Sequence, residues 1–506
     1  MAEPTVKVRT GRLIGNEGDG YVEFLGVPYA RAPIGPAAFE APEPLPGSDE
    51  AIDGRRYGAA AHRRGPGGGL IPEPAPSGDN PLNLNVWTPS PGPAHLPVFV
   101  WIHGGGFTGG SNASPWYHGG NFARRGVVAV GINYRLGPEG WLDLGDGNAN
   151  RGLWDQITAL RWIQENIAAL GGDPARVTIG GQSAGATSCL ALLAGTPARG
   201  LFRATAAQSS GGMIPAGPDE ARRMAEHYAA ALGVGLDPAA LAGVAADRRA
   251  AVEPDYLPSS AGRRPAWEGV DGATAFGHET LTWRPTIDGR VVEDDAYRRA
   301  ASGFVNGEAL LVGCTSEEFN SALAPASTAM SEAEVVAAMR TLGLDDSGVA
   351  AYLRLGRERG SLAWGIAQAY TDWRFRIPAG VMAAASAGSG TAVYRYEFRF
   401  ASRALGPGVA QARHSSDIPF VWDNLTAAGV AEGVGTDAPQ NLADQMHRAW
   451  VRFIEGDEPW PRYEPTTPRT MIFDAGSALG DPGATLATWW GASQGSARSP
   501  QPAETT

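Results

Sequence analysis

Five short runs of apolar, mostly β-branched residues constrain the fold of this chain more than any other feature. Strands buried on both faces of a sheet show continuous runs of this kind rather than alternation, and such strands are typical of parallel sheets. We therefore predict strands at Val98–Ile102, Val127–Ile132, Val177–Ile179, Leu310–Val312 and Val393–Phe398.

One amphipathic stretch, Asp155–Leu170, lies between the second and third of these runs. Its apolar residues Ile157, Leu160, Ile163 and Ile167 recur at helical spacing. Strand, helix and strand in this order form a βαβ unit. The sequence thus predicts an α/β protein with a central, mostly parallel sheet flanked by helices.

The chain shows no internal linker that would divide it, so we expect one catalytic domain over residues 1–490. Residues 213–300, with a helical pattern at Glu220–Leu232, predict an insertion of helices and loops over the sheet. The Gly- and Pro-rich segment His62–Asn80 predicts a mobile surface loop. Residues 491–506 are dominated by small polar residues and proline, which predicts a disordered tail.

Charge and cysteine content exclude several classes of protein. The net charge is −12 and no Lys/Arg-rich stripe is present, which argues against a nucleic-acid partner. Two cysteines cannot build a disulfide framework. No secretory segment and no apolar run of about 18 residues is visible, so we expect a cytoplasmic protein without a membrane span. No cluster has metal-ligand spacing, and we expect no metal or cofactor. The oligomeric state is not predicted.

The candidate nucleophile is Ser183, within Gly181-Gln182-Ser183-Ala184-Gly185. This G-x-S-x-G pattern is weak by itself in a glycine-rich chain. However, a predicted strand precedes it and a predicted helix, Ala184–Leu193, follows it. A serine on a tight turn between strand and helix is exposed at the top of a sheet in α/β-hydrolases. The alternative is a surface serine in a glycine-rich loop.

A second glycine-rich turn, His103-Gly104-Gly105-Gly106, directly follows the strand Val98–Ile102. Attack on an ester carbonyl creates a negative oxygen, and preorganised N–H donors stabilise it. We predict that the backbone N–H groups of Gly105, Gly106 and Ala184 form this oxyanion hole. The alternative is an ordinary turn, because Gly-Gly-Gly also occurs at Gly67–Gly69 without such a context.

These motifs, together with others in the same order, resemble the type-B carboxylesterase and cholinesterase family, and most of all the bacterial para-nitrobenzyl esterases. The resemblance spans most of the chain. The shared stretches include Phe24–Ala30, Leu84–Pro89, His103–Phe107, Asn133–Gly137, Asn148–Ala186, Gln208–Gly211 and Trp460–Tyr463. It implies an α/β-hydrolase fold with helical and loop insertions over the active site.

The candidate base is His414, one of eight histidines. A serine needs a histidine to take its proton at neutral pH. In α/β-hydrolases the histidine comes last in the chain, after the nucleophile and the acid. His414 follows the last predicted strand, and the resemblance places the family's histidine there, with an acidic residue, Asp417, three positions later.

The candidate acid follows the strand Leu310–Val312, in Gly313-Cys314-Thr315-Ser316-Glu317-Glu318. The acid orients the imidazole and stabilises its cation during proton transfer. The resemblance places the acid five residues after the glycine, which is Glu318. Glu317 is the alternative.

Three departures from the family pattern affect these expectations. Gln182 replaces the glutamate that usually precedes the serine, so we expect a preference for neutral esters and activity at slightly lower pH. Phe319 replaces a glycine after the acid, and either alters the turn or lines the pocket. Pro81 stands where many relatives carry a cysteine. The family disulfide is then absent, and Cys189 and Cys314 are interpreted as buried apolar residues.

Several aromatic residues fall on segments that border the acyl and alcohol pockets in the family, although aromatic residues belong to the core at least as often. With Gln182 and Phe319, the candidate pocket residues are Phe107, Trp116, Trp373, Phe375, Phe420 and Trp422.

The sequence therefore predicts a serine carboxylesterase that cleaves small to medium neutral esters through a Ser-His-Glu triad and an acyl-enzyme. A carbamate or aryl-amide hydrolase with the same residues is the first alternative, because some relatives with Gly-Gln-Ser at this turn resemble carbamate-cleaving enzymes. A non-catalytic binding protein of the cholinesterase type is the second, although such proteins have lost the serine.

Overall fold

The computed structural model describes residues 3–63, 70–212, 215–256, 281–320, 330–404 and 410–483. The predicted tail at 491–506 lies outside these residues, and so does part of the predicted insertion at 213–300.

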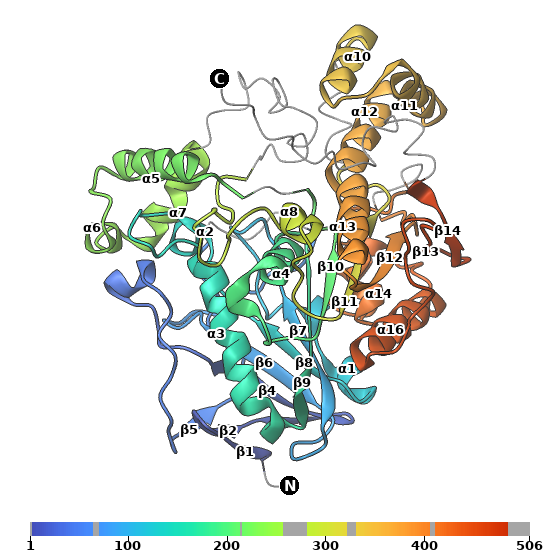
Figure 1. Ribbon diagram of the computed structural model, residues 1–506. Helices are drawn as coiled ribbons and strands as arrows, with labels where there is room; N and C mark the ends of the chain where they lie inside the picture. The colour runs from blue at the N-terminus through green and yellow to red at the C-terminus, as the bar shows by residue number, and fades with distance from the viewer. Residues whose placement is uncertain are drawn as a thin grey trace.

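Within these ranges the centre of the molecule is an 11-stranded sheet (Figure 1). In spatial order its strands are β14 (Ala478–Gly480), β13 (Thr470–Phe473), β12 (Ala392–Phe398), β11 (Ala309–Thr315), β10 (Ala204–Gln208), β9 (Gly172–Gln182), β7 (Leu96–Ile102), β8 (Val128–Ile132), β6 (Asn83–Thr88), β4 (Tyr21–Pro28) and β3 (Asn16–Gly18). A separate three-stranded sheet contains β1 (Thr5–Val8), β2 (Gly11–Ile14) and β5 (Ala51–Asp53).

The seven neighbouring strands β13, β12, β11, β10, β9, β7 and β8 pair in parallel. At the two ends of the sheet, β14 pairs antiparallel with β13, and β6, β4 and β3 continue antiparallel from β8. All five predicted strands are present, and the predicted α/β class with a mostly parallel sheet is confirmed. The sequence did not predict β10, whose residues Ala-Thr-Ala-Ala-Gln lack the β-branched pattern. Its position between β9 and β11 supplies the strand conformation instead.

Helices of very different lengths surround the sheet. They are α1 (Gly120–Arg124), α2 (Gly137–Trp141), α3 (Arg151–Asn166), α4 (Ala184–Ala194), α5 (Pro218–Leu232), α6 (Pro238–Ala242), α7 (Ala246–Tyr256), α8 (Ala296–Ala301), α10 (Glu332–Thr341), α11 (Asp346–Glu358), α12 (Leu362–Thr371), α13 (Ile377–Gly388), α14 (Ile418–Val421), α15 (Val430–Val434) and α16 (Gln440–Glu455).

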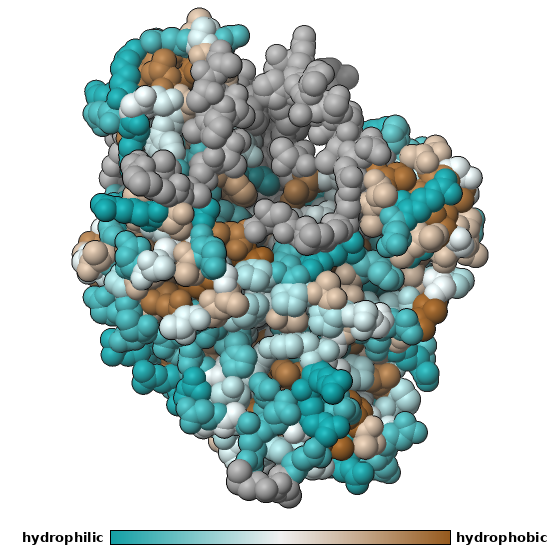
Figure 2. Space-filling view, turned by 180° about the vertical axis from the view of Figure 1, so that it is seen from behind, coloured by the Kyte–Doolittle hydropathy of each residue, from teal (hydrophilic) through white to brown (hydrophobic). Residues whose placement is uncertain are grey.

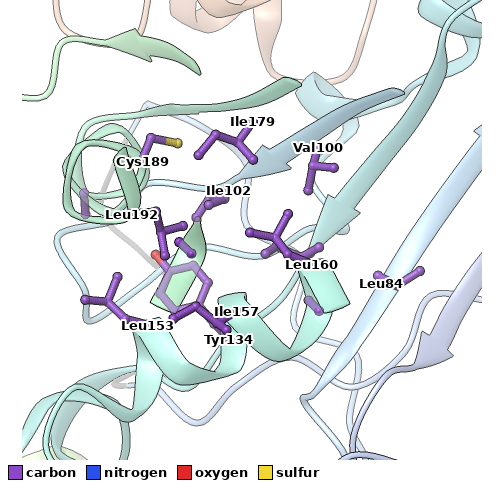
Figure 3. Packing of buried hydrophobic residues seen from close by; sticks show 14 of the residues in the cluster. Leu84, Val100, Ile102, Tyr134, Leu153, Ile157, Leu160, Ile179, Cys189 and Leu192 are labelled. Atoms are coloured by element: carbon purple, nitrogen blue, oxygen red, sulfur yellow. The ribbon is translucent and has the colours of Figure 1, made fainter. Parts of the chain in front are cut away.

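One face of the sheet packs against α3 and α4. Figure 3 shows Leu153, Ile157 and Leu160 of α3 directed toward strand residues such as Val100 and Ile102. The predicted helix Asp155–Leu170 is thus confirmed, although it starts earlier and ends in a 3₁₀ turn at Ile167–Leu170. Cys189 of α4 lies in the same apolar cluster, and both cysteines are buried free thiols.

The other face of the sheet is covered by a second apolar cluster, to which α1, α14 and α16 contribute. It contains Trp101 of β7, Phe122 of α1, and Trp450 of α16, all of them fully buried. The two clusters make the sheet a layer between two hydrophobic cores, which is why its strands read as continuous apolar runs.

Two helical groups lie at the end of the molecule opposite the N-terminus (Figure 1). The first is α5–α7, and its helix α5 confirms the pattern predicted at Glu220–Leu232. The second is α10–α12, which has its own small apolar cluster around Tyr352 and Trp373. The sequence did not predict this second group. A π-helical turn, Asp372–Arg376, joins α12 to α13.

The described ends of the loop His62–Asn80 are held together without a disulfide. Arg63 forms an ion pair with Glu73, and the two side chains are only 6% and 12% exposed. Leu70 and Ile71 pack against the second apolar cluster. A buried ion pair thus joins the two described parts of this loop.

The surface seen in Figure 2 is mainly hydrophilic, with apolar residues in separate small groups. In the part of the chain that the structure describes, no helix combines the length and the apolar character needed to cross a bilayer.

Candidate active site

Ser183 occupies the sharp turn between β9 and α4. Its backbone has φ 57° and ψ −124°, a left-handed conformation that is unfavourable for a residue with a side chain. Two backbone hydrogen bonds hold it there. The Ser183 N–H donates to the carbonyl oxygen of Gln208 at 2.9 Å, and its carbonyl accepts from the N–H of Thr187 at 2.9 Å. These bonds fix the Ser183 backbone between the end of β10 and the first turn of α4.

The two glycines of the motif are required by close packing. A β-carbon on Gly185 would lie 2.0 Å from the carbonyl oxygen of Ile102, at the end of β7. A β-carbon on Gly181 would lie 2.6 Å from the carbonyl carbon of Gly185. The first turn of α4 thus packs directly against the strand ends, and no larger residue fits at either position.

The glycine turn after β7 runs beside the serine. A β-carbon on Gly104 would lie 3.2 Å from the β-carbon of Ser183. Gly105 and Gly106 have φ values of +119° and +61°, which glycine adopts without strain. Three candidate donors, the N–H groups of Gly105, Gly106 and Ala184, therefore belong to backbone segments adjacent to the serine.

His103 stabilises this turn and is not available as a base. Its ring stacks on Tyr134 at 4.6 Å, and the Tyr134 hydroxyl donates to the His103 carbonyl at 2.9 Å. Burial lowers the pKa of His103 to about 4, so the ring is neutral at physiological pH.

His414 and Glu318 are in direct contact. The imidazole Nδ1 faces the Glu318 Oε2 atom. In addition, the backbone N–H of His414 donates to the backbone carbonyl oxygen of Glu318 at 2.8 Å. The second carboxylate oxygen, Oε1, accepts from the N–H of Thr315 at 2.9 Å. The end of β11 therefore orients the carboxylate, and the carboxylate orients the imidazole.

Glu317, the alternative acid, has other partners. One of its oxygens pairs with Arg359 at 2.8 Å and the other accepts from the N–H of Ala412 at 3.2 Å. Burial raises the pKa of this carboxyl group above its ordinary value. Of the two neighbouring carboxylates, Glu318 is the one that touches His414.

The other imidazole nitrogen, Nε2, lies 3.0 Å from the side-chain nitrogen of Gln182. Within the described residues no hydrogen bond joins the Ser183 hydroxyl to His414. Hydrogen bonds between catalytic groups are often long or absent before substrate binds. His414 thus contacts the residue directly before Ser183.

Two of the candidate pocket aromatics lie on the imidazole. Phe319 stacks on His414 with ring centroids 4.6 Å apart and an interplanar angle of 28°. Phe375, from the π-helical turn, lies 5.4 Å from His414 and 5.6 Å from Phe319. Phe319 is 37% exposed, which is unusual for a large apolar residue among those that the structure describes. It occupies the position where the family pattern has glycine.

The other five candidate pocket aromatics are buried in the apolar clusters, and their place in a pocket stays a prediction: Phe107, Trp116, Trp373, Phe420 and Trp422. Phe107 packs on Trp141 at 4.3 Å. The Trp116 indole donates to the carbonyl of Ala428 at 3.2 Å, and Trp422 meets Phe122 edge to face at 5.1 Å. Their large apolar area is buried in the core, the alternative that applies to most aromatic residues.

Asp417 is a buried carboxylate that was not among the candidate site residues. Its Oδ2 accepts from the Tyr396 hydroxyl at 2.8 Å and from the Gln208 side chain at 2.9 Å. Gln208 in turn pairs with Gln182 in the sheet register. Burial raises the pKa of Asp417 to about 6, and the negative charge of Glu318 contributes. Its place three residues after His414 was the only signal in the sequence.

Comparison with known proteins places the chain in a family. The model of the carboxylesterase family matches residues 2–473. The chain is 31% identical to the para-nitrobenzyl esterase of Bacillus subtilis (strain 168), over 94% of this chain and 96% of that protein. It is 32% identical to the phenmedipham hydrolase of Pseudarthrobacter oxydans, over 96% and 97%.

A solved structure agrees with these similarities. A carboxylesterase of Geobacillus stearothermophilus, crystallised at pH 6.2, has a TM-score of 0.81 and 32% identity, covering 96% of this chain and 99% of that one. The fold is therefore the α/β-hydrolase fold. The chain belongs to the carboxylesterase family, and it is an enzyme that acts on ester bonds.

The raised pKa of Asp417 predicts a specific pH dependence of stability. The folded value of about 6 exceeds the ordinary value of 3.8, so the folded protein holds this proton more tightly than the unfolded chain. The free energy of unfolding should therefore fall as the pH rises from about 4 to about 6, by at most about 3 kcal/mol. Asp417→Asn should lack this component in urea unfolding across that range. Parallel pH dependences of the two proteins would contradict the prediction.

The stacked Phe319 ring predicts a contribution to activity. Phe319→Leu keeps an apolar side chain but removes the aromatic face from His414, and such ring pairs contribute about 0.5–1.5 kcal/mol. We expect kcat/KM for an aryl ester to fall about two- to tenfold. Phe304→Leu serves as the control, because this ring packs on Arg299 instead. An unchanged kcat/KM in Phe319→Leu would rule out this contribution.

Proposed function

We propose that the protein is a carboxylesterase that cleaves small to medium neutral esters with Ser183 as nucleophile, His414 as base and Glu318 as supporting acid. The observation that carries the proposal is the contact between His414 Nδ1 and the buried Glu318 carboxylate, beside a serine in the strained strand–helix turn. This is the arrangement that raises the reactivity of a serine hydroxyl.

The reaction is acyl transfer through two tetrahedral intermediates. Ser183 Oγ attacks the carbonyl carbon of the ester while His414 Nε2 takes the hydroxyl proton. The carbonyl oxygen becomes negative and accepts hydrogen bonds from the N–H groups of Gly105, Gly106 and Ala184. The intermediate then collapses, the ester C–O bond breaks, and His414 gives its proton to the leaving alcohol.

Water completes the cycle by the same route in reverse order. His414 takes a proton from water, the hydroxide attacks the acyl carbon, and the bond to Ser183 Oγ breaks as the proton returns to the serine. Glu318 keeps its negative charge throughout and stabilises the imidazolium that forms in each half-reaction.

Substitutions at the two neighbouring glutamates test the assignment. Ser183→Ala should lower kcat for a nitrophenyl ester by at least about 10⁴-fold, and Glu318→Gln by about 10³- to 10⁴-fold. Glu317→Gln is the matched control, because Glu317 pairs with Arg359, and it should retain most of the activity. A larger loss in Glu317→Gln than in Glu318→Gln would identify Glu317 as the acid.

A carbamate or aryl-amide substrate is the second candidate function. It is favoured by Gln182 at the serine turn and by the 32% identity to phenmedipham hydrolase. The same atoms would act, with an amine as the leaving group of an amide.

Initial rates on nitrophenyl acetate and butyrate, an aryl carbamate and phenmedipham distinguish the two candidates. We expect kcat/KM for the esters to exceed that for the nitrogen-containing substrates by at least about tenfold, because an ester carbonyl is the more reactive. The reverse order would make the carbamate or amide the preferred substrate class. A fluorophosphonate should label Ser183 in either case, and the absence of labelling would favour the non-catalytic alternative.

A further inference from the structure

We infer that Gln182 is a positioning residue that occupies Nε2 of His414 in the resting enzyme and stabilises the neutral imidazole. The imidazole must then exchange the Gln182 amide for the Ser183 hydroxyl when a turnover begins. This inference rests on the proposed function of His414 as the base, and it assigns a role to the residue that departs from the family pattern.

The first observation is that both ring nitrogens of His414 have partners. Nδ1 contacts the Glu318 carboxylate, and Nε2 lies 3.0 Å from Gln182 Nε2. A carboxylate only accepts hydrogen bonds, so Nδ1 carries the proton of the neutral ring. Nε2 then presents a lone pair, for which only the NH₂ group of the Gln182 amide is a suitable partner. The contact of Nδ1 with the Glu318 carboxylate therefore fixes the direction of the second hydrogen bond, in which the Gln182 amide donates to Nε2.

The second observation is that the Gln182 side chain is confined. The residue is 1% exposed. A β-carbon on Gly104 would lie 3.0 Å from Gln182 Oε1 and 2.6 Å from its backbone carbonyl oxygen. The space left by this glycine thus holds the oxygen end of the amide, while the nitrogen end faces His414. Gln182 bridges the imidazole and the glycine turn beside Ser183.

The charges around His414 show why an uncharged amide matters here. Glu318 contacts the ring, and the buried Asp417 carboxylate accepts hydrogen bonds from Tyr396 and Gln208. Both carboxylates favour the imidazolium. The Gln182 amide has the opposite effect, because its N–H donates to the neutral ring and cannot donate to a protonated Nε2. The rings of Phe319 and Phe375 near His414 carry no net charge.

Two consequences follow for the free enzyme. The amide donates to the neutral form of the His414 ring, which is the form competent as a base. It also competes with the Ser183 hydroxyl for Nε2, so a fraction of the resting enzyme has to rearrange before attack. A glutamate at this position would favour the imidazolium through its negative charge, and it could not donate a hydrogen bond to Nε2 in place of the Ser183 hydroxyl.

The experiment compares Gln182→Met, which has a side chain of similar length without a hydrogen-bonding group, with Gln182→Glu. The first readout is the midpoint of the acidic limb of kcat/KM against pH for a neutral nitrophenyl ester. The loss of one neutral hydrogen bond should move this midpoint upward by about half to one pH unit in Gln182→Met. The added negative charge in Gln182→Glu should move it further in the same direction.

The second readout is the rate of fluorophosphonate labelling at a pH on the plateau above the measured acidic limb of every variant. Release of Nε2 should increase this rate about two- to tenfold in Gln182→Met. Gln440→Met on α16 is the matched control, because its side chain bonds Asp423 and Asp444 away from the serine, and it should match the parent protein in both readouts.

The sign of the pH shift decides the outcome. A downward shift in Gln182→Met would mean that the amide oxygen faces Nε2 and stabilises the imidazolium, which overturns the inference. An unchanged midpoint or labelling rate overturns it as well. If Gln182→Met fails to fold, the midpoint in the nearly isosteric Gln182→Glu still has to rise. Ser183→Ala tests the proposed function separately, since labelling that persists in this variant refutes the nucleophile and not the role of Gln182.

Discussion

The strained backbone of Ser183 is the constraint on which the site depends. A left-handed serine is unfavourable by itself, and it persists only where the surrounding structure fixes it. Here the first turn of α4 packs so closely on the ends of β7 and β9 that a single β-carbon on Gly185 would lie 2.0 Å from the Ile102 carbonyl oxygen. The same contact brings the glycine turn after β7 alongside the serine. One packing arrangement thus sets both the nucleophile and its candidate hydrogen-bond donors.

The remaining site residues reach this turn from the parallel half of the sheet. β11 leads to Glu318, and the segment after β12 carries His414, while Gln208 at the end of β10 supports both Ser183 and Asp417. Parallel neighbours end at the same edge of a sheet, so residues far apart in the chain meet there. Several buried polar groups at this edge bond one another, which partly compensates for their removal from water, whereas Gln208 Oε1 and Asp417 Oδ1 have no hydrogen-bond partner among the described residues. The result is a network with several carboxylates and one imidazole.

The sequence predicted the strands β7, β8, β9, β11 and β12, because buried parallel strands leave a direct signal in the form of continuous apolar runs. It missed β10, whose alanine-rich sequence lacks the β-branched pattern, and the outer strands β3, β4, β6, β13 and β14. It also missed the helices α10–α12, which form a small cluster of their own. For the site, Ser183, His414 and Glu318 came from motif, chain order and resemblance. The sequence could not separate pocket aromatics from core aromatics, since burial in a core or exposure in a pocket depends on tertiary contacts that composition does not encode. Contacts of Gln182 and Asp417 with their neighbours could be found only in three dimensions.

A crystal structure of the enzyme after reaction with a fluorophosphonate tests the central claim most directly. The account predicts phosphorus bonded to Ser183 Oγ, with the phosphonyl oxygen within about 3 Å of the N–H groups of Gly105, Gly106 and Ala184. His414 should have left Gln182 and should face the serine oxygen through Nε2, with Glu318 still on Nδ1. A label on another residue, or an imidazole that stays on Gln182 and out of reach of Ser183, would contradict it.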